Sequence, residues 1–252
     1  MFEKGSEWRR WDLHVHTPNT KKNDNYKGDT VEEKWKNFYS AIETYINSTD
    51  ERKKVSAIGI TDYLAIDNYN KVVSDGILVK DELAIFPNVE MRITPMGKKS
   101  PVNIHFIFNP DFVDKLENRF FGRLEFEYGR KYHATKSDLI ELGKSMGIED
   151  NEEAYKKGIE QFVPSYTAIS NLFKDDVELR ENTLIGVANN SPNYKFKFEY
   201  RSGSIENSTI VYENDGTIRK GVLNEKGIQQ HICDILEGGE RAFDLRKHKY
   251  SI

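Results

Sequence analysis

Cysteine is almost absent from this sequence: Cys233 is the single one among 252 residues. One thiol cannot close a disulfide within the chain, so the fold cannot depend on a disulfide framework, and the composition suits a reducing cytoplasm. Because Cys233 is flanked by Ile232 and a further apolar stretch, core packing is favoured over a role as a nucleophile.

Long apolar runs and a dominant charge are absent as well. No stretch approaches the roughly 20 apolar residues of a membrane-spanning helix, and residues 1–7 lack the basic and apolar regions of a secretory signal. The 37 Lys and Arg nearly balance the 41 Asp and Glu, for a net charge of −4. We therefore expect a cytoplasmic protein with no membrane partner, in which any binding of nucleic acid needs a local basic patch.

What the sequence does contain is an alternation of strand-like and helical segments. Short, largely apolar runs typical of buried strands occupy residues 11–16, 55–62, 83–91, 102–108 and 183–189. Apolar residues at helical spacing occupy residues 31–46, 66–73, 137–146, 152–173 (interrupted near Pro164) and 227–236. The alternation predicts one α/β domain over residues 1–252, with a mostly parallel sheet or barrel.

A β-hairpin is expected near residues 195–223. Residues 208–213 and 217–222 read as strands, and they flank Asn214-Asp215-Gly216, a strong turn signal.

Two of the six histidines lie close together in the first strand-like run, Asp12-Leu13-His14-Val15-His16. Residues i and i+2 of a strand share a face, so His14 and His16 are expected to project together. Two adjacent imidazoles can hold a divalent metal ion. The alternative is that two histidines share a solvated strand face without a metal.

Further candidate ligands fall on the next strand-like runs: Asp62, Glu90 and His105. In α/β barrels the carboxyl ends of the strands meet at one mouth, where sites are built. A mixture of imidazole and carboxylate suits Zn²⁺, Mn²⁺ or Fe²⁺. Each residue also has an ordinary alternative: Asp62 as a helix cap, Glu90 as an ion-pair partner of Arg92, and His105 as a core histidine.

The order and spacing of these residues resemble the PHP (polymerase and histidinol phosphatase) superfamily. Asp12-Leu13-His14-Val15-His16-Thr17 resembles its first motif. Its second, third and fourth motifs are resembled by Ile60-Thr61-Asp62, Val89-Glu90 and Asn103-Ile104-His105. Residues 5–11, Gly-Ser-Glu-Trp-Arg-Arg-Trp, are similar to the opening of TrlF-like PHP domains, which are associated with AAA/SMC-type ATPases.

The resemblance implies a distorted (β/α)7 TIM-like barrel, the PHP fold, with one to three divalent ions (Mn, Zn or Fe) at its mouth. It implies a phosphoesterase, and more narrowly a nuclease that acts on nucleic acid with an ATPase partner in antiviral defence. By the same resemblance the metal ligands are His14, His16, Asp62, Glu90 and His105, and Asp12 orients a histidine. We add Arg92 as a candidate for binding phosphoryl oxygens.

The chain also departs from the family pattern. Tyr63 follows Asp62 where a histidine is usual, Asn189-Asn190-Ser191-Pro192 replaces a histidine before proline, and the closing Asp-x-His motif is absent. The barrel is therefore expected to be incomplete at its C-terminus, in a natural short form or a fragment. A small-molecule phosphomonoesterase and a degenerate PHP fold that serves as a binding or assembly module stay open, as does oligomerisation.

A mixture of basic and aromatic residues occupies positions 120–132, including Arg123, Arg130 and Lys131. Such a mixture suits contacts with nucleic acid. The alternative, favoured because Glu125 and Glu127 dilute the charge, is the surface of an ordinary amphipathic helix.

Overall fold

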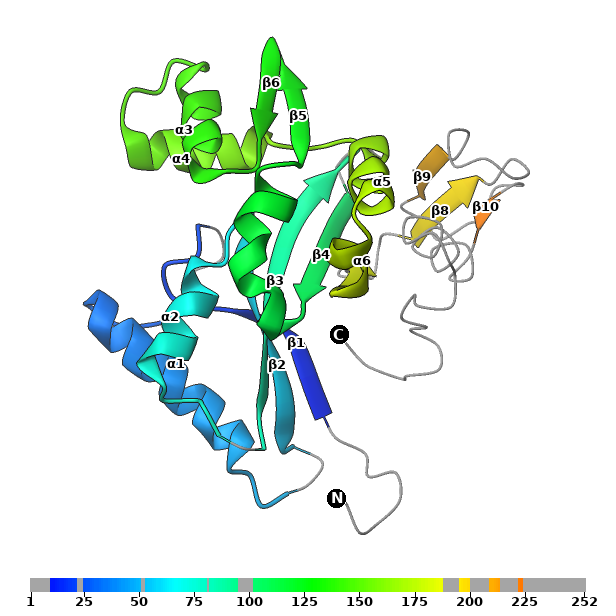
Figure 1. The fold of residues 1–252 in the computed structure, drawn as a ribbon. Helices are drawn as coiled ribbons and strands as arrows, with labels where there is room; N and C mark the ends of the chain where they lie inside the picture. Colours follow the sequence, from blue (N-terminus) through cyan, green and yellow to red (C-terminus); the bar gives the residue numbers. More distant parts are fainter. Residues whose placement is uncertain are drawn as a thin grey trace. The chain divides into compact units, whose positions relative to one another are not determined.

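The computed structural model describes residues 10–21, 25–50, 53–80, 82–94, 102–187, 195–199, 209–213 and 222–223. The chain divides into two compact units, Met1–Val89 and Glu90–Ser251; the single PHP-like domain stays a prediction. Helices and strands are mixed along the chain, which confirms the α/β class (Figure 1). The largest sheet has five strands in the order β1-β2-β3-β4-β7, and the described residues do not show its closure into a barrel.

The first unit is built on two parallel strands and two helices. Strand β1 pairs in parallel with β2, and helices α1 and α2 both pack against β2 (Figure 1). The elements are β1 (Arg10–His16), α1 (Val31–Ile46), β2 (Val55–Tyr63), α2 (Asp67–Asp75) and the first part of β3 (Ala84–Ile93).

Helix α1 begins and ends where its apolar spacing predicts. The Thr30 side chain accepts a hydrogen bond from the backbone N–H of Glu33, which satisfies one of the unpaired donors at the start of the helix. Trp35, Phe38 and Tyr39 are buried and their rings contact one another, so this face holds α1 on the unit.

The second unit continues from β3 and contains the remaining described elements. They are β4 (Val102–Phe108), η1 (Pro110–Lys115), η2 (Glu117–Phe121), β5 (Glu125–Tyr128), β6 (Arg130–His133), α3 (Lys136–Lys144), α4 (Asn151–Gln161), α5 (Tyr166–Asp175), α6 (Val177–Glu181), β7 (Thr183–Val187), β8 (Lys195–Glu199), β9 (Thr209–Glu213) and β10 (Val222–Leu223). Strand β7 runs antiparallel to β4. Phe106, Phe120 and Phe173 form an aromatic core between β4, η2 and α5.

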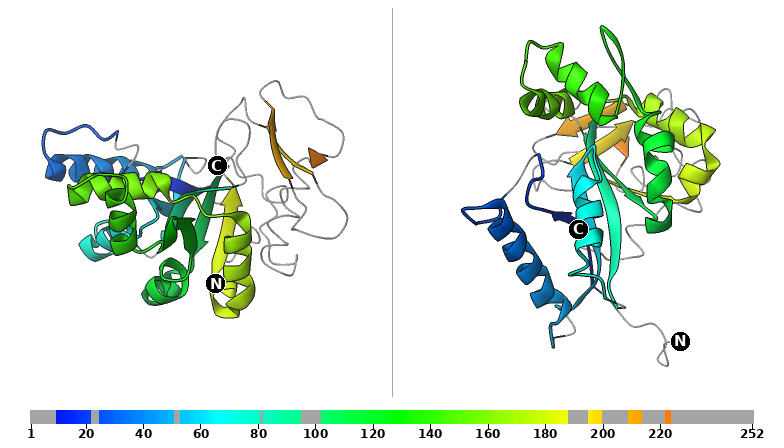
Figure 2. Two further views of the ribbon diagram at one scale, coloured as in Figure 1. Left: turned by 90° about the horizontal axis from the view of Figure 1, so that it is seen from above. Right: turned by 60° about the vertical axis from the view of Figure 1, so that its left-hand side comes forward.

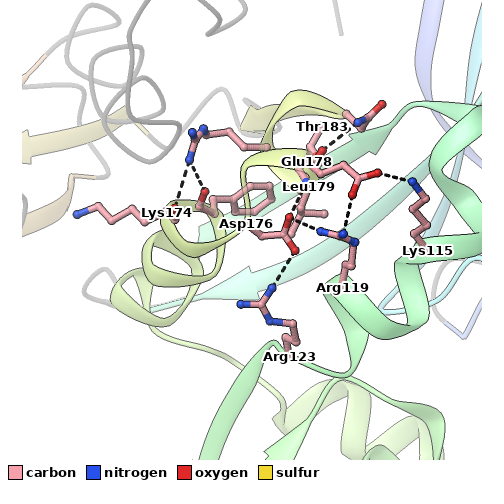
Figure 3. A network of polar contacts seen from close by, with 11 residues as sticks. Lys115, Arg119, Arg123, Lys174, Asp176, Glu178, Leu179 and Thr183 are labelled. Atoms are coloured by element: carbon pink, nitrogen blue, oxygen red, sulfur yellow. Dashed lines mark hydrogen bonds and ion pairs between the residues drawn. The ribbon is translucent and has the colours of Figure 1, made fainter.

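Asp176 joins η2 to α6 in the second unit (Figure 3). Its side chain is 3% exposed and pairs with Arg119 at 2.7 Å and Arg123 at 2.8 Å. It also accepts the N–H of Leu179 at 3.0 Å, as the N-cap of α6. A buried carboxylate with three donors is fully compensated, so this network fixes α6 against η2.

The amphipathic helix favoured for residues around 120–132 is wrong. Helix η2 ends at Phe121, and residues 125–133 form the antiparallel hairpin β5–β6. The chain reverses at Gly129, whose φ of 71° is a left-handed conformation that glycine adopts without strain. The aromatic residues here alternate with charged ones, which is a strand period.

Antiparallel strands are present within residues 195–223. Strands β9 and β10 both pair with β8, in the order β10-β8-β9. The register of β8 with β9 runs from Lys195 opposite Glu213 to Glu199 opposite Thr209. The turn expected at 214–216 and most of the second strand expected at 217–222 lie outside the described residues, so the predicted pairing of these two segments stays a prediction.

Three other expectations lie outside the described residues: the stretch 227–236 with Cys233, the segment Asn189–Pro192, and the opening motif at residues 5–9. Within the described ranges, no helix combines the length and apolar character needed to cross a membrane.

Candidate metal centre

His14 and His16 face each other at the end of β1. Their Nε2 atoms are 3.1 Å apart, and the rings meet edge to face at 4.9 Å. One carboxylate oxygen of Glu90, on β3, completes a group whose ligand atoms all lie within 4.8 Å of one another. The three residues that come together are those predicted by the first and third motifs.

The spacing of the two imidazoles fits a shared ion. Nitrogens about 2.0–2.1 Å from one metal, at tetrahedral or octahedral angles, lie about 2.9–3.4 Å apart. The observed 3.1 Å falls in this range. A single hydrogen bond between the rings would give a similar distance, so the third donor, Glu90, is what favours a metal. Glu90 is 1% exposed, and an ionised carboxylate at such a position is costly unless it is compensated.

A β-bulge in β1 positions the histidine pair. Asp12 lies opposite Ile58, whereas Val15 lies opposite Ile60, so β1 advances by three residues while β2 advances by two. Bulges redirect side chains and are frequent beside functional sites. The extra residue falls at Leu13 or His14, between the paired positions.

The register also sets which residues of β2 face His16. His16 lies opposite Thr61. Side chains alternate along a strand, so Thr61 and Tyr63 share one face of β2 and Asp62 lies on the other.

Three residues hold the bulged backbone. The Asn88 side chain donates from Nδ2 to the Leu13 carbonyl at 2.6 Å and to Thr61 Oγ1 at 3.0 Å. The Thr61 hydroxyl donates to the Gly59 carbonyl at 3.2 Å. A Cβ on Gly59 would lie 2.3 Å from the Leu13 carbonyl oxygen, so only glycine admits this approach.

Asn88 and Thr61 are 1% and 0% exposed, so their polar groups depend on these bonds. We call Gly59, Thr61 and Asn88 the bulge clamp. No motif marks these three residues in the sequence; the one available signal is an asparagine two residues before Glu90, in an otherwise apolar strand-like run.

Asp12 contacts His14 through the backbone. Its Oδ1 accepts the His14 N–H at 3.3 Å, so Asp12 holds the backbone at this histidine. The His16 ring stacks on Tyr63, with centroids 5.7 Å apart and planes at 17°. Tyr26 donates its hydroxyl to the His16 carbonyl at 3.1 Å. Tyr63, where the family has a histidine, thus packs against a ligand candidate.

Asp62 is bonded to the first turn of α2, whose N-cap position is occupied by Ile66. Its carboxylate accepts bonds from the Asn68 backbone N at 3.1 Å and from Asn68 Nδ2 at 2.7 Å, near the start of α2. Burial raises the pKa of Asp62 to about 6, and the bonds from Asn68 only partly oppose this. The structure does not bring Asp62 into the three-residue group, so its role as a ligand stays a prediction.

The remaining candidates lie on β3 and β4. Glu90 Oε1 accepts a bond from Asn103 Nδ2 at 2.7 Å, which fixes the carboxylate. By strand alternation Arg92 shares the face of Glu90, and His105 shares the face of Asn103. Arg92 is half-buried and His105 is buried at 5% exposure. His105 is not among the three grouped residues, and its role as a ligand also stays a prediction.

Comparisons with known proteins add little to this geometry. No family model and no curated protein matches the sequence. A solved structure from Bifidobacterium adolescentis, described as a candidate metal-dependent phosphoesterase, aligns with a TM-score of 0.38 and 11% identity, over 96% of this chain and 85% of that chain. A TM-score below 0.5 does not establish a shared fold, so the chain's own side chains must carry the functional conclusion.

Proposed function

We propose that this protein is a metal-dependent phosphoesterase whose ion is held by His14, His16 and Glu90. The observation that carries the proposal is the meeting of two imidazole nitrogens and one buried carboxylate within 4.8 Å. Two histidines and one glutamate are a donor set of catalytic zinc sites, which keep a further position open for water or substrate. The same donors accept Mn²⁺ or Fe²⁺.

A divalent ion bound there supplies Lewis acidity toward a phosphoryl oxygen and lowers the pKa of coordinated water. The protein's own groups supply positioning. Asn103 holds Glu90 in place, and the bulge clamp sets the direction of the histidines. Arg92, two residues beyond Glu90 on the same strand face, is the candidate for binding negative charge that develops on the phosphoryl group.

We propose one ion per chain. The resemblance implies as many as three, but the Asp62 carboxylate is engaged by Asn68. Tyr63 covers the ring of His16 where the family supplies another ligand. A single His₂Glu site is what the remaining donors support.

The finer parts of the proposal rest on the resemblance of residues 5–17. They are a nuclease activity on phosphodiester bonds in nucleic acid, an AAA/SMC-type ATPase partner, a role in antiviral defence, and the (β/α)7 barrel. The parallel pairing of β1 with β2 supports the barrel but does not require it.

Hydrolysis of two model esters tests the proposal. The protein is loaded with Zn²⁺, Mn²⁺ or Fe²⁺ and assayed on bis(p-nitrophenyl) phosphate, a diester, and on p-nitrophenyl phosphate, a monoester. We expect diester hydrolysis that is lost in the His14→Ala, His16→Ala double variant. His133→Ala is the control, because His133 lies on β6 and is absent from the three-residue group.

Hydrolysis of the monoester alone would favour a small-molecule phosphatase over a nuclease. No metal uptake and no hydrolysis of either ester would contradict the enzyme and leave a binding or assembly module.

A further inference from the structure

The hairpin β5–β6 presents two chemically different faces. In its register Glu125 lies opposite His133, Phe126 opposite Tyr132, Glu127 opposite Lys131, and Tyr128 opposite Arg130. Alternation therefore puts Glu125, Glu127, Lys131 and His133 on one face and Phe126, Tyr128, Arg130 and Tyr132 on the other. The turn between the strands extends beyond α3 and α4 (Figures 1 and 2).

The charged face is compensated within itself. Lys131 Nζ lies 2.9 Å from Glu125 Oε2. His133 Nδ1 lies 3.1 Å from Asp138 Oδ2, at the start of α3. Lys131 and Glu125 thus offset each other's charge, which leaves less positive charge on this face for a partner to bind.

The aromatic face is anchored at its base and open at its tip. Tyr132 is buried at 3% exposure, and the Phe126 ring lies 5.3 Å from that of Phe162. Tyr128, at the tip, is 47% exposed. The hairpin thus holds an exposed phenol ring on a fixed support.

Arg130 adds a positive charge beside that ring. Its guanidinium lies 3.9 Å from the centroid of the Tyr132 ring, a cation–π contact that orients the group. Nη1 donates to the Lys131 carbonyl at 3.1 Å. Within the described part of the chain, no ion pair to a carboxylate compensates Arg130, so its charge and remaining donors face outward.

We propose that the tip of this hairpin, Tyr128 with Arg130, binds an unpaired nucleotide of single-stranded nucleic acid. The base stacks on the Tyr128 ring, and the Arg130 guanidinium donates to phosphate oxygens. Aromatic rings that stack bases beside cations that bind the backbone are the common elements of single-strand recognition. A guanidinium matches the geometry of a phosphate better than an ammonium does.

The single-stranded form follows from the geometry of the tip. In a duplex the faces of the bases are stacked on one another and are closed to a side chain, whereas an unpaired base offers its face. This inference rests on the proposed action on phosphodiesters and names the form of nucleic acid that would be held for it. Tyr and Arg are also enriched in protein interfaces, and that partner is an outcome of the test below.

Binding of labelled oligonucleotides tests the inference without catalysis. The full chain is titrated in EDTA against a fluorescein-labelled 12-nucleotide thymidine strand and against the matching duplex, and anisotropy is followed. We expect the single strand to bind more tightly than the duplex. Tyr128→Ala and Arg130→Ala should each weaken single-strand binding about tenfold, the scale of one lost stacking platform.

Lys131→Ala is the matched control. It removes the same charge from the same hairpin but from the compensated face, and it should change the affinity less than twofold. Arg130→Lys keeps the charge without the planar fork and should fall between wild type and Arg130→Ala. Circular dichroism of each variant shows whether the hairpin variants keep the wild-type fold.

Equal losses in Lys131→Ala and Arg130→Ala would overturn the proposal, because non-specific charge would then explain binding. Equal affinity for strand and duplex, or no binding to either, would also overturn it and would point to a protein partner for the tip. The two proposals fail separately: loss of metal uptake leaves binding in EDTA untouched, and loss of oligonucleotide binding leaves hydrolysis of the small esters untouched.

Discussion

Replacement of Asn88 by leucine should uncouple the histidine pair from its support while keeping the volume of the side chain. The Asn88 amide donates to the Leu13 carbonyl and to Thr61 Oγ1; Asn88 and Thr61 are buried, and Leu13 is half-buried. A buried polar group left without its partner costs about 1–3 kcal/mol. Two such losses give about 2–6 kcal/mol, against a typical total stability of about 5–15 kcal/mol, so the variant should fold with reduced stability.

The effect on the metal should exceed the effect of general destabilisation. Without the bond to Leu13 the bulge is free to relax, and the two Nε2 atoms lose their 3.1 Å spacing. Residues that orient metal ligands typically contribute about 10–100-fold in metal affinity. We expect a loss of that size for Asn88→Leu, measured by competition with a chromophoric chelator, alongside urea denaturation in EDTA.

Thr183→Val is the matched control. Thr183 is 6% exposed and donates from Oγ1 to the Leu179 carbonyl at 2.7 Å, far along the chain from the histidines. It should lower the stability by about 1 kcal/mol and leave the metal affinity at the wild-type value. If Asn88→Leu lowers the stability but keeps the wild-type affinity, then the bulge forms without the clamp and the reasoning is refuted.

Three further changes test other parts of the structure. Gly59→Ala places a Cβ 2.3 Å from the Leu13 carbonyl oxygen and should cost about 1–3 kcal/mol; an unchanged melting temperature would show that the strands can part there. Burial raises the pKa of Asp62 from 3.8 to about 6. In the presence of chelator, the free energy of unfolding should therefore fall by on the order of 3 kcal/mol as the pH rises from about 4 to about 6, because the folded state disfavours the ionised carboxylate. Asp62→Asn should abolish this loss in urea titrations across pH, and a persisting slope would assign it to another group. Asp176→Ala removes the buried partner of Arg119 and Arg123 and the cap of α6. Both arginine side chains are more than a third exposed, so the loss should be about 1–3 kcal/mol; an unchanged stability would show that the network of Figure 3 is not structural.

Local patterns predicted most of the elements. Residues 31–46 form α1 as their apolar spacing indicates, because the period of 3.6 and the Thr30 cap agree. Strand β4 has its predicted bounds, and Ser165 begins α5 just after Pro164 interrupts the helical pattern. In these segments the local signal, which is the apolar period, the cap or the proline, is enough to set the element and its bounds.

The site could be predicted only in part, because its geometry depends on the pairing of strands. Alternation places His14 and His16 together in any register. The irregular register of β1 is invisible in the sequence, and in this register His16 lies opposite Thr61. Asn88 carries no motif of its own, because its role follows from the carbonyl that it meets.

Metal content and affinity of the purified protein test the central claim most directly. The chain is purified without chelator, analysed by inductively coupled plasma mass spectrometry, and then titrated with Zn²⁺, Mn²⁺ and Fe²⁺ beside the His14→Ala, His16→Ala and Glu90→Gln variants. The account predicts one bound ion per wild-type chain, none in the double histidine variant, and weakened binding in Glu90→Gln. An unoccupied wild-type protein that takes up no metal, or a double variant that keeps the wild-type content, would contradict it.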